Sequence, residues 1–350
     1  MATAWYATRE DVKGALDSAE TARNNGQVDR AIASGSRAIE ALTHRRFYPQ
    51  LAVRYFDWPN PNSRTAFRLW LDADEVITVT SLTAGGVAIP ATDYFLEPFN
   101  SGPPFTHVEI DLDSPSAFSS GGTRQRAIAI TGTFGHSANE EPVGALTASL
   151  AADPAATATA TWTTARIGVG DILRIDAERV IVTERTMVDS TQNLGNTMTA
   201  SAGDVTVQVS NGTAFTAEEV ILVGSERMRI VDIAGNSLTV KRAWDGTVLA
   251  AHSSGVDVFT LTGVELDRAQ LGTTLAAHSS GATIYRHVVP DLVRDLCIAE
   301  AVNQLQQETS GYARVIGEGE NAREGTGRGL FDLRRDTMAA YGRQARARAV

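Results

Sequence analysis

Only one cysteine, Cys297, and two lysines, Lys13 and Lys241, occur among the 350 residues of the chain. A single cysteine excludes a disulfide framework and a zinc site built on cysteine ligands. The apolar runs are short and strand-like, so no stretch approaches the roughly 20 apolar residues that a membrane-spanning helix needs. The first residues, MATAWYATREDVKG, place no apolar core behind a basic segment, so we expect no secretory signal.

Positive charge is in deficit, because 31 Lys and Arg residues face 41 Asp and Glu residues and leave a net charge of −10. A general nucleic-acid binder needs a basic surface to meet the phosphates, so this balance argues against that class of protein. The remaining composition, 43% hydrophobic and 21% charged, is that of a folded protein with room for two or three domains.

Motifs for catalysis and cofactor binding are missing as well. The glycine-rich stretch 317–329 lacks the Gly-Lys-Ser/Thr of a phosphate-binding loop and follows a predicted helix, not a strand. The six histidines include no HExxH and no pair at helical spacing to a carboxylate. Cys297 falls on or beside an apolar helical stripe, which predicts a buried, inert thiol. We therefore expect no enzyme activity, no metal ion and no cofactor.

Two helices are predicted before residue 50. Thr8 is a suitable N-cap for a first helix from Arg9 to about Asn24, and a turn is expected at 24–26. The second helix has apolar residues every three or four positions, namely Val28, Ala31, Ile32, Ile39 and Leu42. Gly35 interrupts this stripe at a cost of roughly 1 kcal/mol, which predicts a close neighbour against its bare backbone.

From residue 51 the apolar period changes to two, which is typical of antiparallel strands. The predicted strands are 53–58, 67–71, 76–82, 87–89, 94–96, 107–112 and 127–131. Gly85-Gly86 indicates a hairpin between the third and the fourth. Helical periodicity returns at Val289-Pro290-Asp291 and continues to residue 307. Its expected apolar face consists of Leu292, Leu296, Ala299, Val302 (or Asn303) and Leu305 (or Gln306).

The middle of the chain contains an internal repeat. GTVLAAHSSG at 246–255 recurs as GTTLAAHSSG at 272–281, and DILRIDAERVIV at 171–182 resembles EVILVGSERMRI at 219–230. The simplest interpretation is an inner β unit at 197–260, nested in an outer unit at 145–190 plus 262–286. A tandem arrangement with a degenerate third copy is the alternative.

We expect the two repeated histidines, and the residues ahead of the repeats, to have structural roles. His252 and His278 are expected to satisfy the local backbone of their turns, in preference to forming a metal pair or a dyad with Ser253 or Ser279. Residues 137–165 are rich in Ala, Thr, Ser and Pro and read as a linker, in which Glu140 and Glu141 are solvated.

The pattern as a whole predicts an α+β fold, in which a small helical core with an antiparallel β region is interrupted by an inserted all-β domain of two related units. The core comprises residues 1–137 plus 288–350, and the inserted domain comprises residues 138–287.

Several segments of the flanks follow one another in a characteristic order: RRFYP at 45–49, the strand 76–82 with its glycine turn, DYFLEP at 93–98, and IAITGTFG at 128–135. One pattern of this order is a strand that ends in Gly-x-Phe-Gly and is followed closely by a proline and an amphipathic helix. In this chain the two parts of the pattern are separated, because the strand ends at Gly135 and the helix begins after Val289-Pro290. With the flanks joined, this order resembles the head–tail adaptors (connectors) of long-tailed bacteriophages. The resemblance leaves the insertion unexplained.

The resemblance implies a structural virion protein, not an enzyme, that joins the portal of a DNA-filled head to the tail. It implies a homo-oligomeric ring, a dodecamer, around a channel through which double-stranded DNA passes without specific binding. The implied partners are the portal protein and the next neck or tail-completion protein, with no membrane. The protein would be made in the bacterial host cytoplasm and reside in the neck of the virion.

Two segments are candidates for partner binding. The exit of the second helix offers Arg45, Arg46, Phe47 and Tyr48. The C-terminal arm offers Leu330, Phe331, Arg334, Arg335 and Met338. The apolar face of the arm is small for so short a helix, so we expect the arm not to fold alone but to order on a neighbouring subunit or the portal. A solvated tail is the alternative.

Two other classes of function stay open. A tail or baseplate component would use the β repeats to bind a host-surface glycan or protein, and it predicts exposed aromatic residues in the insertion, such as Trp162 and Trp244. An uncharacterised hydrolase would need His252 or His278 to face a carboxylate across a cleft.

Overall fold

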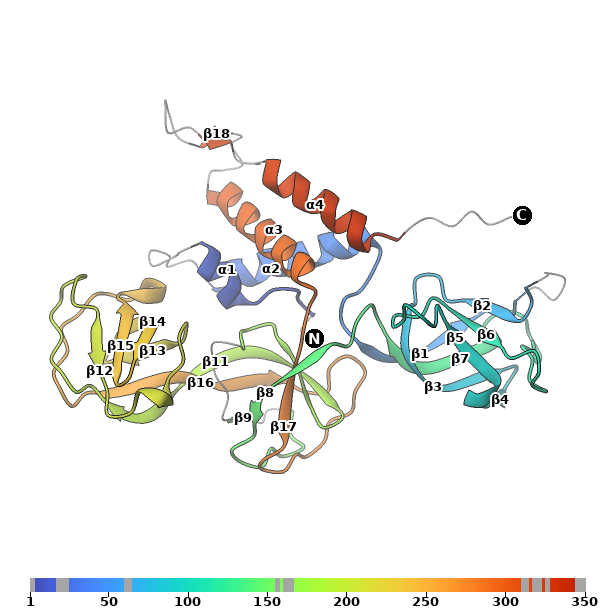
Figure 1. Cartoon of the computed structure of the whole chain (residues 1–350), viewed down its shortest axis with the longest axis horizontal. Coiled ribbons are helices and arrows are strands. Elements are labelled where there is room, and N and C mark those ends of the chain that lie inside the picture. Colours follow the sequence, from blue (N-terminus) through green and yellow to red (C-terminus); the bar gives the residue numbers. More distant parts are fainter. Residues whose placement is uncertain are drawn as a thin grey trace.

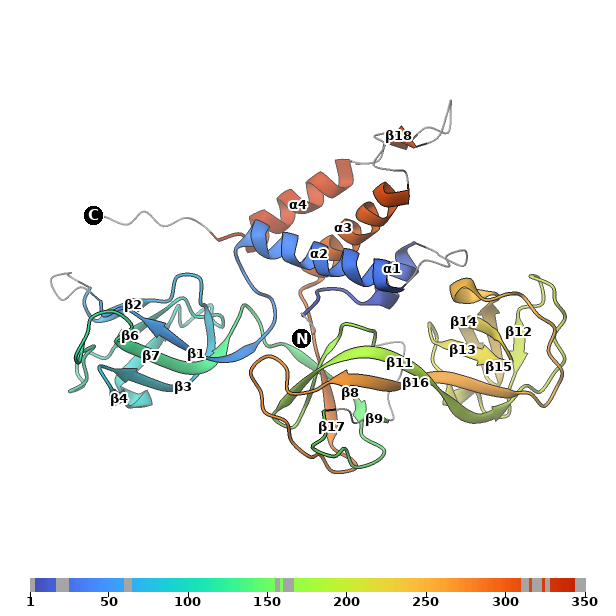
Figure 2. The same ribbon diagram turned by 180° about the vertical axis from the view of Figure 1, so that it is seen from behind.

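The computed structural model describes residues 4–16, 25–59, 65–154, 158–159, 167–309, 315–316, 323–324 and 328–343. Within these ranges the chain is a mixed α+β protein with four helices and antiparallel sheets, and this fold class confirms the prediction (Figure 1). The helices gather on one side, and three β regions lie in a row beneath them (Figures 1 and 2). No helix in these ranges is both long and apolar enough to cross a membrane.

The first helix, α1 (Arg9–Ala15), is set by its cap. The Thr8 hydroxyl accepts a hydrogen bond from the Asp11 N–H, and the Asp11 carboxylate accepts one from the Thr8 N–H. This capping box confirms the predicted N-cap. α1 ends earlier than expected, and the rest of the predicted helix, from residue 17 to Asn24, lies outside the described ranges.

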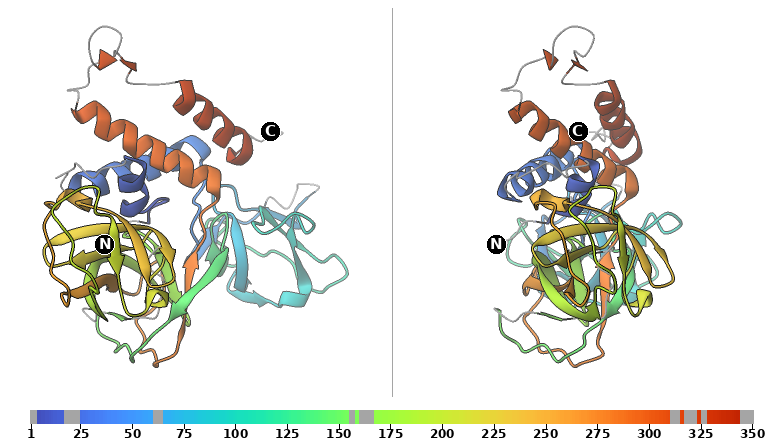
Figure 3. Two further views of the ribbon diagram at one scale, coloured as in Figure 1. Left: turned by 60° about the vertical axis from the view of Figure 1, so that its left-hand side comes forward. Right: turned by 90° about the vertical axis from the view of Figure 1, so that its left-hand side faces the viewer.

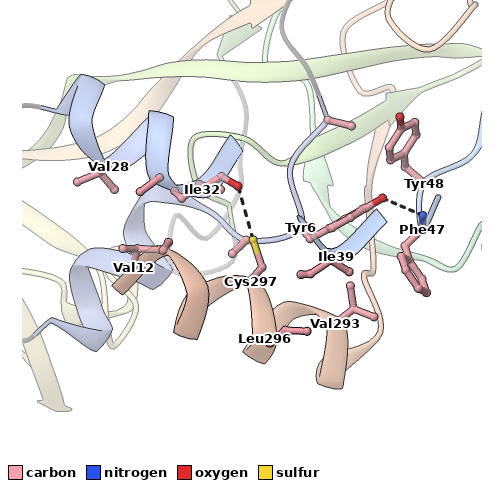
Figure 4. Packing of buried hydrophobic residues seen from close by; sticks show 14 of the residues in the cluster. Tyr6, Val12, Val28, Ile32, Ile39, Phe47, Tyr48, Val293, Leu296 and Cys297 are labelled. Carbon is pink, nitrogen blue, oxygen red and sulfur yellow. Dashed lines mark hydrogen bonds between the residues drawn. The ribbon is translucent and has the colours of Figure 1, made fainter. Parts of the chain in front are cut away.

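The longest helices, α2 (Asn25–Thr43) and α3 (Asp291–Thr309), pack directly on each other (Figure 4). Asn25 and Gly26 already belong to α2, so the predicted turn at 24–26 is wrong at these positions, because the first turn of a helix tolerates both residues. The buried face of α3 consists of Val293, Leu296, Cys297, Ala301 and Leu305. Leu296 and Leu305 confirm part of the predicted face, whereas Leu292 and Ala299 are only partly buried. Apolar residues occur almost all round this helix, so periodicity alone cannot define its face fully.

Gly35 lies where α2 and α3 come closest. A Cβ atom at this position would be 3.2 Å from the Glu300 Cβ and 3.4 Å from the Cys297 carbonyl oxygen, which confirms the predicted close neighbour. The Cys297 thiol is buried beside the Ser36 hydroxyl at 3.4 Å, and burial raises its pKa to about 11. The thiol is therefore protonated at neutral pH, as an inert core cysteine should be.

The first β region contains every strand predicted between residues 51 and 131. Its strands are β1 (Gln50–Phe56), β2 (Arg68–Trp70), β3 (Val76–Ala84), β4 (Val87–Ile89), β5 (Tyr94–Glu97), β6 (His107–Ile110) and β7 (Ile128–Phe134). They form one sheet in the order β1-β7-β3-β4 and a second in the order β2-β6-β5 around a shared apolar core. Gly85 and Gly86 make the β3–β4 turn with φ of 56° and 84°, a conformation that favours glycine.

A ten-stranded antiparallel sheet forms the other two β regions. Its strands are β8 (Glu140–Ala145), β9 (Ala158–Thr159), β10 (Ile172–Ile175), β11 (Glu178–Asn193), β12 (Thr206–Gln208), β13 (Val220–Val223), β14 (Glu226–Ala234), β15 (Ser237–Lys241), β16 (Asp257–Asp267) and β17 (Thr283–His287). The order is β12-β15-β14-β13-β16-β11-β10-β17-β8, with β9 on β16. A small pair, β18 (Val315–Ile316) and β19 (Arg323–Glu324), lies apart from it.

This sheet encloses two separate apolar cores. We call the part around Val143, Leu173 and Ile284 the proximal unit, and the part around Val207, Ile221, Met228 and Val258 the distal unit. β11 and β16 pair through both units, with three irregularities in register, and join them (Figure 1).

The linker predicted at 137–165 is wrong for its first part. β8 pairs with β17, and Leu146 and Leu150 are buried in the proximal core. The strand was missed because its sequence, EEPVGA, has the composition of a linker and is held by pairing with residues far along the chain. Glu140 and Glu141 are not free solvated charges: Glu140 accepts hydrogen bonds from Arg174 and Arg179, and Glu141 accepts one from Arg286.

The helices lie above the β regions (Figure 3), and their core continues into the proximal unit. Ile172 and Ile181 of that unit belong to the helical core, and the Arg9 N–H donates to the Val169 carbonyl at 3.0 Å. The buried guanidinium of Arg9 pairs with Asp29 of α2 and with Glu184 of β11. The helical region and the proximal unit therefore share part of one core.

The last helix, α4 (Arg328–Tyr341), packs on its own chain, contrary to the expectation that the arm does not fold alone. Leu330, Leu333 and Tyr341 contact the helical core, and the Arg334 guanidinium pairs with Glu300 of α3. The helical core therefore supplies the apolar contacts that so short a helix needs in order to be stable.

Candidate functional site

Phe47 and Tyr48, predicted to bind a partner at the exit of α2, are buried inside the chain. The Phe47 ring contacts the rings of Tyr6, His136 and Tyr341 at centroid distances of 5.6, 5.2 and 5.5 Å. The Phe47 N–H donates to the Tyr6 hydroxyl at 3.1 Å (Figure 4). Both aromatic residues are therefore withdrawn from any partner surface.

The arginines at this exit have different environments. Arg45 pairs with the buried carboxylate of Glu75 at 3.2 Å, and Arg343, just after α4, approaches the same carboxylate at 3.5 Å. Arg46 is exposed and contacts Gln50. The structure thus brings the two predicted partner-binding segments together, but they bind each other around Glu75 and Phe47.

Besides Arg46, the outer face of α4 remains available to a partner. Phe331 and Met338 have exposed fractions of 69% and 38%, and Arg335 lies between them at helical spacing. Arg335 pairs only with Asp332 and Asp336 of the same helix among the described residues. Leu330 and Arg334 face α3 instead. We call Phe331, Arg335 and Met338 the α4 surface.

The repeated turns carry a second candidate site, which is a pair of buried ion clusters. In the distal unit the Glu226 carboxylate accepts hydrogen bonds from Arg242 at 2.7 Å and from the N–H groups of Ala243 and Ala250, and His252 lies at 2.9 Å. All of these groups are buried or nearly so.

The proximal unit contains the same cluster at the equivalent positions. Glu178 binds Arg268 at 2.8 Å, the N–H groups of Ala269 and Ala276, and His278 at 2.9 Å. The expectation that the histidines satisfy their local turns is therefore wrong, because each histidine binds a glutamate on a distant strand. The repeated Arg-Ala pairs ahead of each GT, at 242–243 and 268–269, were the signal that could have revealed the clusters.

The clusters hold both glutamates in their charged form. Burial would raise the pKa of each glutamate, but the hydrogen bonds from arginine, backbone and histidine outweigh it and lower both pKa values to about 2. Both carboxylate oxygens are occupied, and His252 and His278 are only 8% and 3% exposed. Among the described residues the histidines thus face carboxylates inside a core, and not across a cleft as a hydrolase would require.

The aromatic residues of the β repeats are also largely covered. Trp244 is buried, with Arg229 and Lys241 over its ring at 5.0 and 5.5 Å, and Tyr285 lies under Arg174. In the part of 138–287 that the structure describes, the exposed large apolar residues are Val231 and Val248. Trp162 lies outside the described ranges.

Comparison of the chain with protein-family models and with curated protein sequences finds no match.

Asp171 lines two cavities of about 330 and 220 Å³; both border α1, α3 and the proximal unit, and the larger also borders the distal unit. Its carboxylate accepts a hydrogen bond from the Gly168 N–H at 2.8 Å. Burial, together with the charges of Asp11 and Glu10, raises its pKa from 3.8 to about 7 against the attraction of Arg286. His136 is shifted in the opposite sense: burial and then Arg45 lower its pKa from 6.5 to about 4.

These two groups oppose each other in the pH dependence of stability. The raised pKa of Asp171 means that stability falls as pH rises from about 4 to about 7, whereas the lowered pKa of His136 means that stability is lost as pH falls over nearly the same range. We expect wild type to vary little there, and D171N to gain on the order of 3 kcal/mol over wild type at pH 8 but almost nothing at pH 4. Urea unfolding at both pH values measures this.

The exposed carboxylate of Asp113 provides the matched control. D113N removes the same charge from an exposed position, so it shows how much of the D171N offset is due to net charge alone. A D171N offset that does not change with pH would contradict the assignment.

Proposed function

We propose that the chain is a structural virion protein, a ring-forming adaptor that joins the portal of a DNA-filled phage head to the tail. In this proposal it resides in the virion neck, contacts the portal on one side and the next neck protein on the other, and surrounds the passing DNA. The net charge of −10 favours a channel that does not hold DNA, since few counterions would be released.

One observation carries the proposal: the two halves of the adaptor-like pattern meet in space. The Val288 N–H, just ahead of α3, donates to the Asn139 carbonyl, just after β7, at 2.8 Å. His287 lies opposite Glu140 in the β17–β8 pair, and α1 and α2 pack with α3 and α4. This arrangement supports a continuous adaptor core into which residues 138–287 are inserted.

The nested interpretation of the insertion has similar support. β11 and β16 pair, with three irregularities in register, from Ile181 opposite Asp267 to Asn193 opposite Asp257, and β12 to β15 lie between them in the chain. A tandem arrangement would place the paired strands of each unit next to each other in sequence.

The α4 surface supports a contact with the portal, because it combines two exposed apolar side chains with an arginine. We expect F331D together with M338D to weaken binding to the portal ring of the same virus by about 100-fold, at roughly 1–2 kcal/mol for each anchor. The fold should be unchanged because both side chains are exposed. Co-sedimentation with purified portal rings and negative-stain imaging of the complex measure the effect.

The matched control is V231D together with V248D, which places the same charges on exposed apolar positions of the distal unit. This control should bind the portal like wild type. If wild type shows no ring on the portal, the proposed function is wrong. If wild type binds and the α4 variant binds equally well, the contact is wrongly placed.

A further inference from the structure

The outward face of the β1-β7-β3-β4 sheet carries no charged residue. β1 contributes Leu51, Val53 and Tyr55, and β7 contributes Ala129, Thr131 and Thr133 in register with them. The outward positions of β3 and β4 add only threonine, serine and alanine. In a chain with 21% charged residues, a whole exposed sheet face without charge is unusual for a solvated surface.

Charge has also been kept off the outward face of β1, which is an edge strand. Val53 and Tyr55 have exposed fractions of 48% and 62%, and Arg54 between them turns to the opposite face, over the Phe134 ring at 5.7 Å. Exposed edge strands normally carry lysine or other charges that prevent pairing with a second chain. β1 therefore has the chemistry of a strand that is covered in the assembled protein.

Part of the backbone of this edge is open as well. The Leu51 N–H points away from β7 and donates to the Leu271 carbonyl at 2.9 Å. Because alternate N–H groups of an antiparallel strand point the same way, those of Val53 and Tyr55 also point away from β7. Among the described residues no strand lies on that side of β1.

The opposite edge of the sheet, formed by β4, is also uncharged and exposed. β4 lies in the uncharged segment GGVAIPAT at 85–92, and its Val87 is 67% exposed. Neighbouring strands of the sheet are all antiparallel, so β4 of another copy placed beside β1 would continue the same alternation. Two copies with a net charge of −10 repel each other, and their contact costs least where both surfaces are free of charge.

We propose that β1 of one copy packs against β4 of a second copy through these uncharged edges. The contact joins two different surfaces, so it propagates head to tail instead of closing a two-fold dimer. The contact between two copies does not depend on the proposed function. Only the closure of many such contacts into a ring rests on the proposed function. The surface is smaller than the 20–30 residues per side of a stable complex, so association of the free protein is weak.

Two complementary variants test the proposal. V53E with Y55E blocks the β1 edge, and V87E with A88E blocks the β4 edge; all four positions are exposed, so melting curves should match wild type. By analytical ultracentrifugation from about 1 μM to about 1 mM, we expect wild type to associate and each variant alone to remain monomeric, with a dissociation constant raised at least about 100-fold. A 1:1 mixture of the two variants should form a heterodimer and nothing larger.

V231E with V248E adds the same charges to the distal unit and should associate like wild type. Association of the β4-blocked variant by itself, a mixture that stays monomeric, or wild type that stays monomeric at the highest concentration would each overturn the proposal. Portal binding is measured separately with the same proteins, so wild type that binds the portal but does not self-associate rejects this contact and leaves the proposed function standing.

Discussion

Replacing residues 138–287 by a short Gly/Ser loop is expected to leave a chain that no longer unfolds cooperatively, although its cut ends lie close together. The deletion removes Ile172 and Ile181 from the helical core, at roughly 2–5 kcal/mol for each large apolar side chain. It also removes Glu184, one of the two carboxylates that pair with the buried Arg9. The free energy of unfolding of a typical protein is about 5–15 kcal/mol, so these losses are large enough to abolish the cooperative fold. Two close ends alone would suggest that the core survives, and these contacts favour the opposite result.

Removing only residues 194–256 is the matched comparison, and it is expected to be tolerated. Asn193 and Asp257 are opposite each other in the β11–β16 ladder, so an Asn-Gly turn can close the two strands. Nearly the whole core of the distal unit leaves with the deletion, and α1 loses one ion pair, between Lys13 and Asp245. Circular dichroism and calorimetry of both deletions measure the difference. A cooperative transition near that of wild type for the 138–287 deletion would show that the helices do not depend on the proximal unit.

Much of the fold could be predicted because it depends on local pattern. The alternation of apolar residues from 51 to 131 identified β1 to β7, and Thr8 identified the start of α1. β8 could not be found in this way, since its six residues have no strand pattern and are held by β17, about 140 residues later. The buried face of α3 was likewise decided by its neighbours, α2 and α4.

The candidate sites were predicted less well for the same physical reason. An aromatic residue at a helix exit can face a partner or a core, and Phe47 faces a core because Tyr341 arrives from the far end of the chain. The repeat drew attention to His252 and His278, but nothing local shows that each one meets a buried glutamate. Such contacts between distant residues become visible only in three dimensions.

The two buried glutamates should respond very differently to one substitution. E178Q and E226Q each leave a buried arginine without its counter-charge, and removal of one partner from a buried pair costs about 3–5 kcal/mol. In E226Q the damage should stay within the distal unit, which has its own core. In E178Q it should reach the helices, because Glu178 begins β11, and β11 and its neighbour β10 carry Ile181 and Ile172 into the helical core. Hydrogen exchange measured by mass spectrometry locates the loosened segments.

D332N is the control, since it breaks an exposed pair with Arg335 that is worth at most about 1 kcal/mol. Acid provides an internal check on the cause. The pKa of both glutamates is lowered to about 2, so their stabilising charge is fully present above about 4.5 and is lost as pH falls toward 2. The difference in unfolding free energy between wild type and either glutamine variant should therefore shrink by about 3 kcal/mol between pH 5 and pH 2. A difference that stays constant over this range would mean that the glutamates act through packing, and identical exchange patterns in E178Q and E226Q would mean that the two units do not divide the chain as their cores indicate.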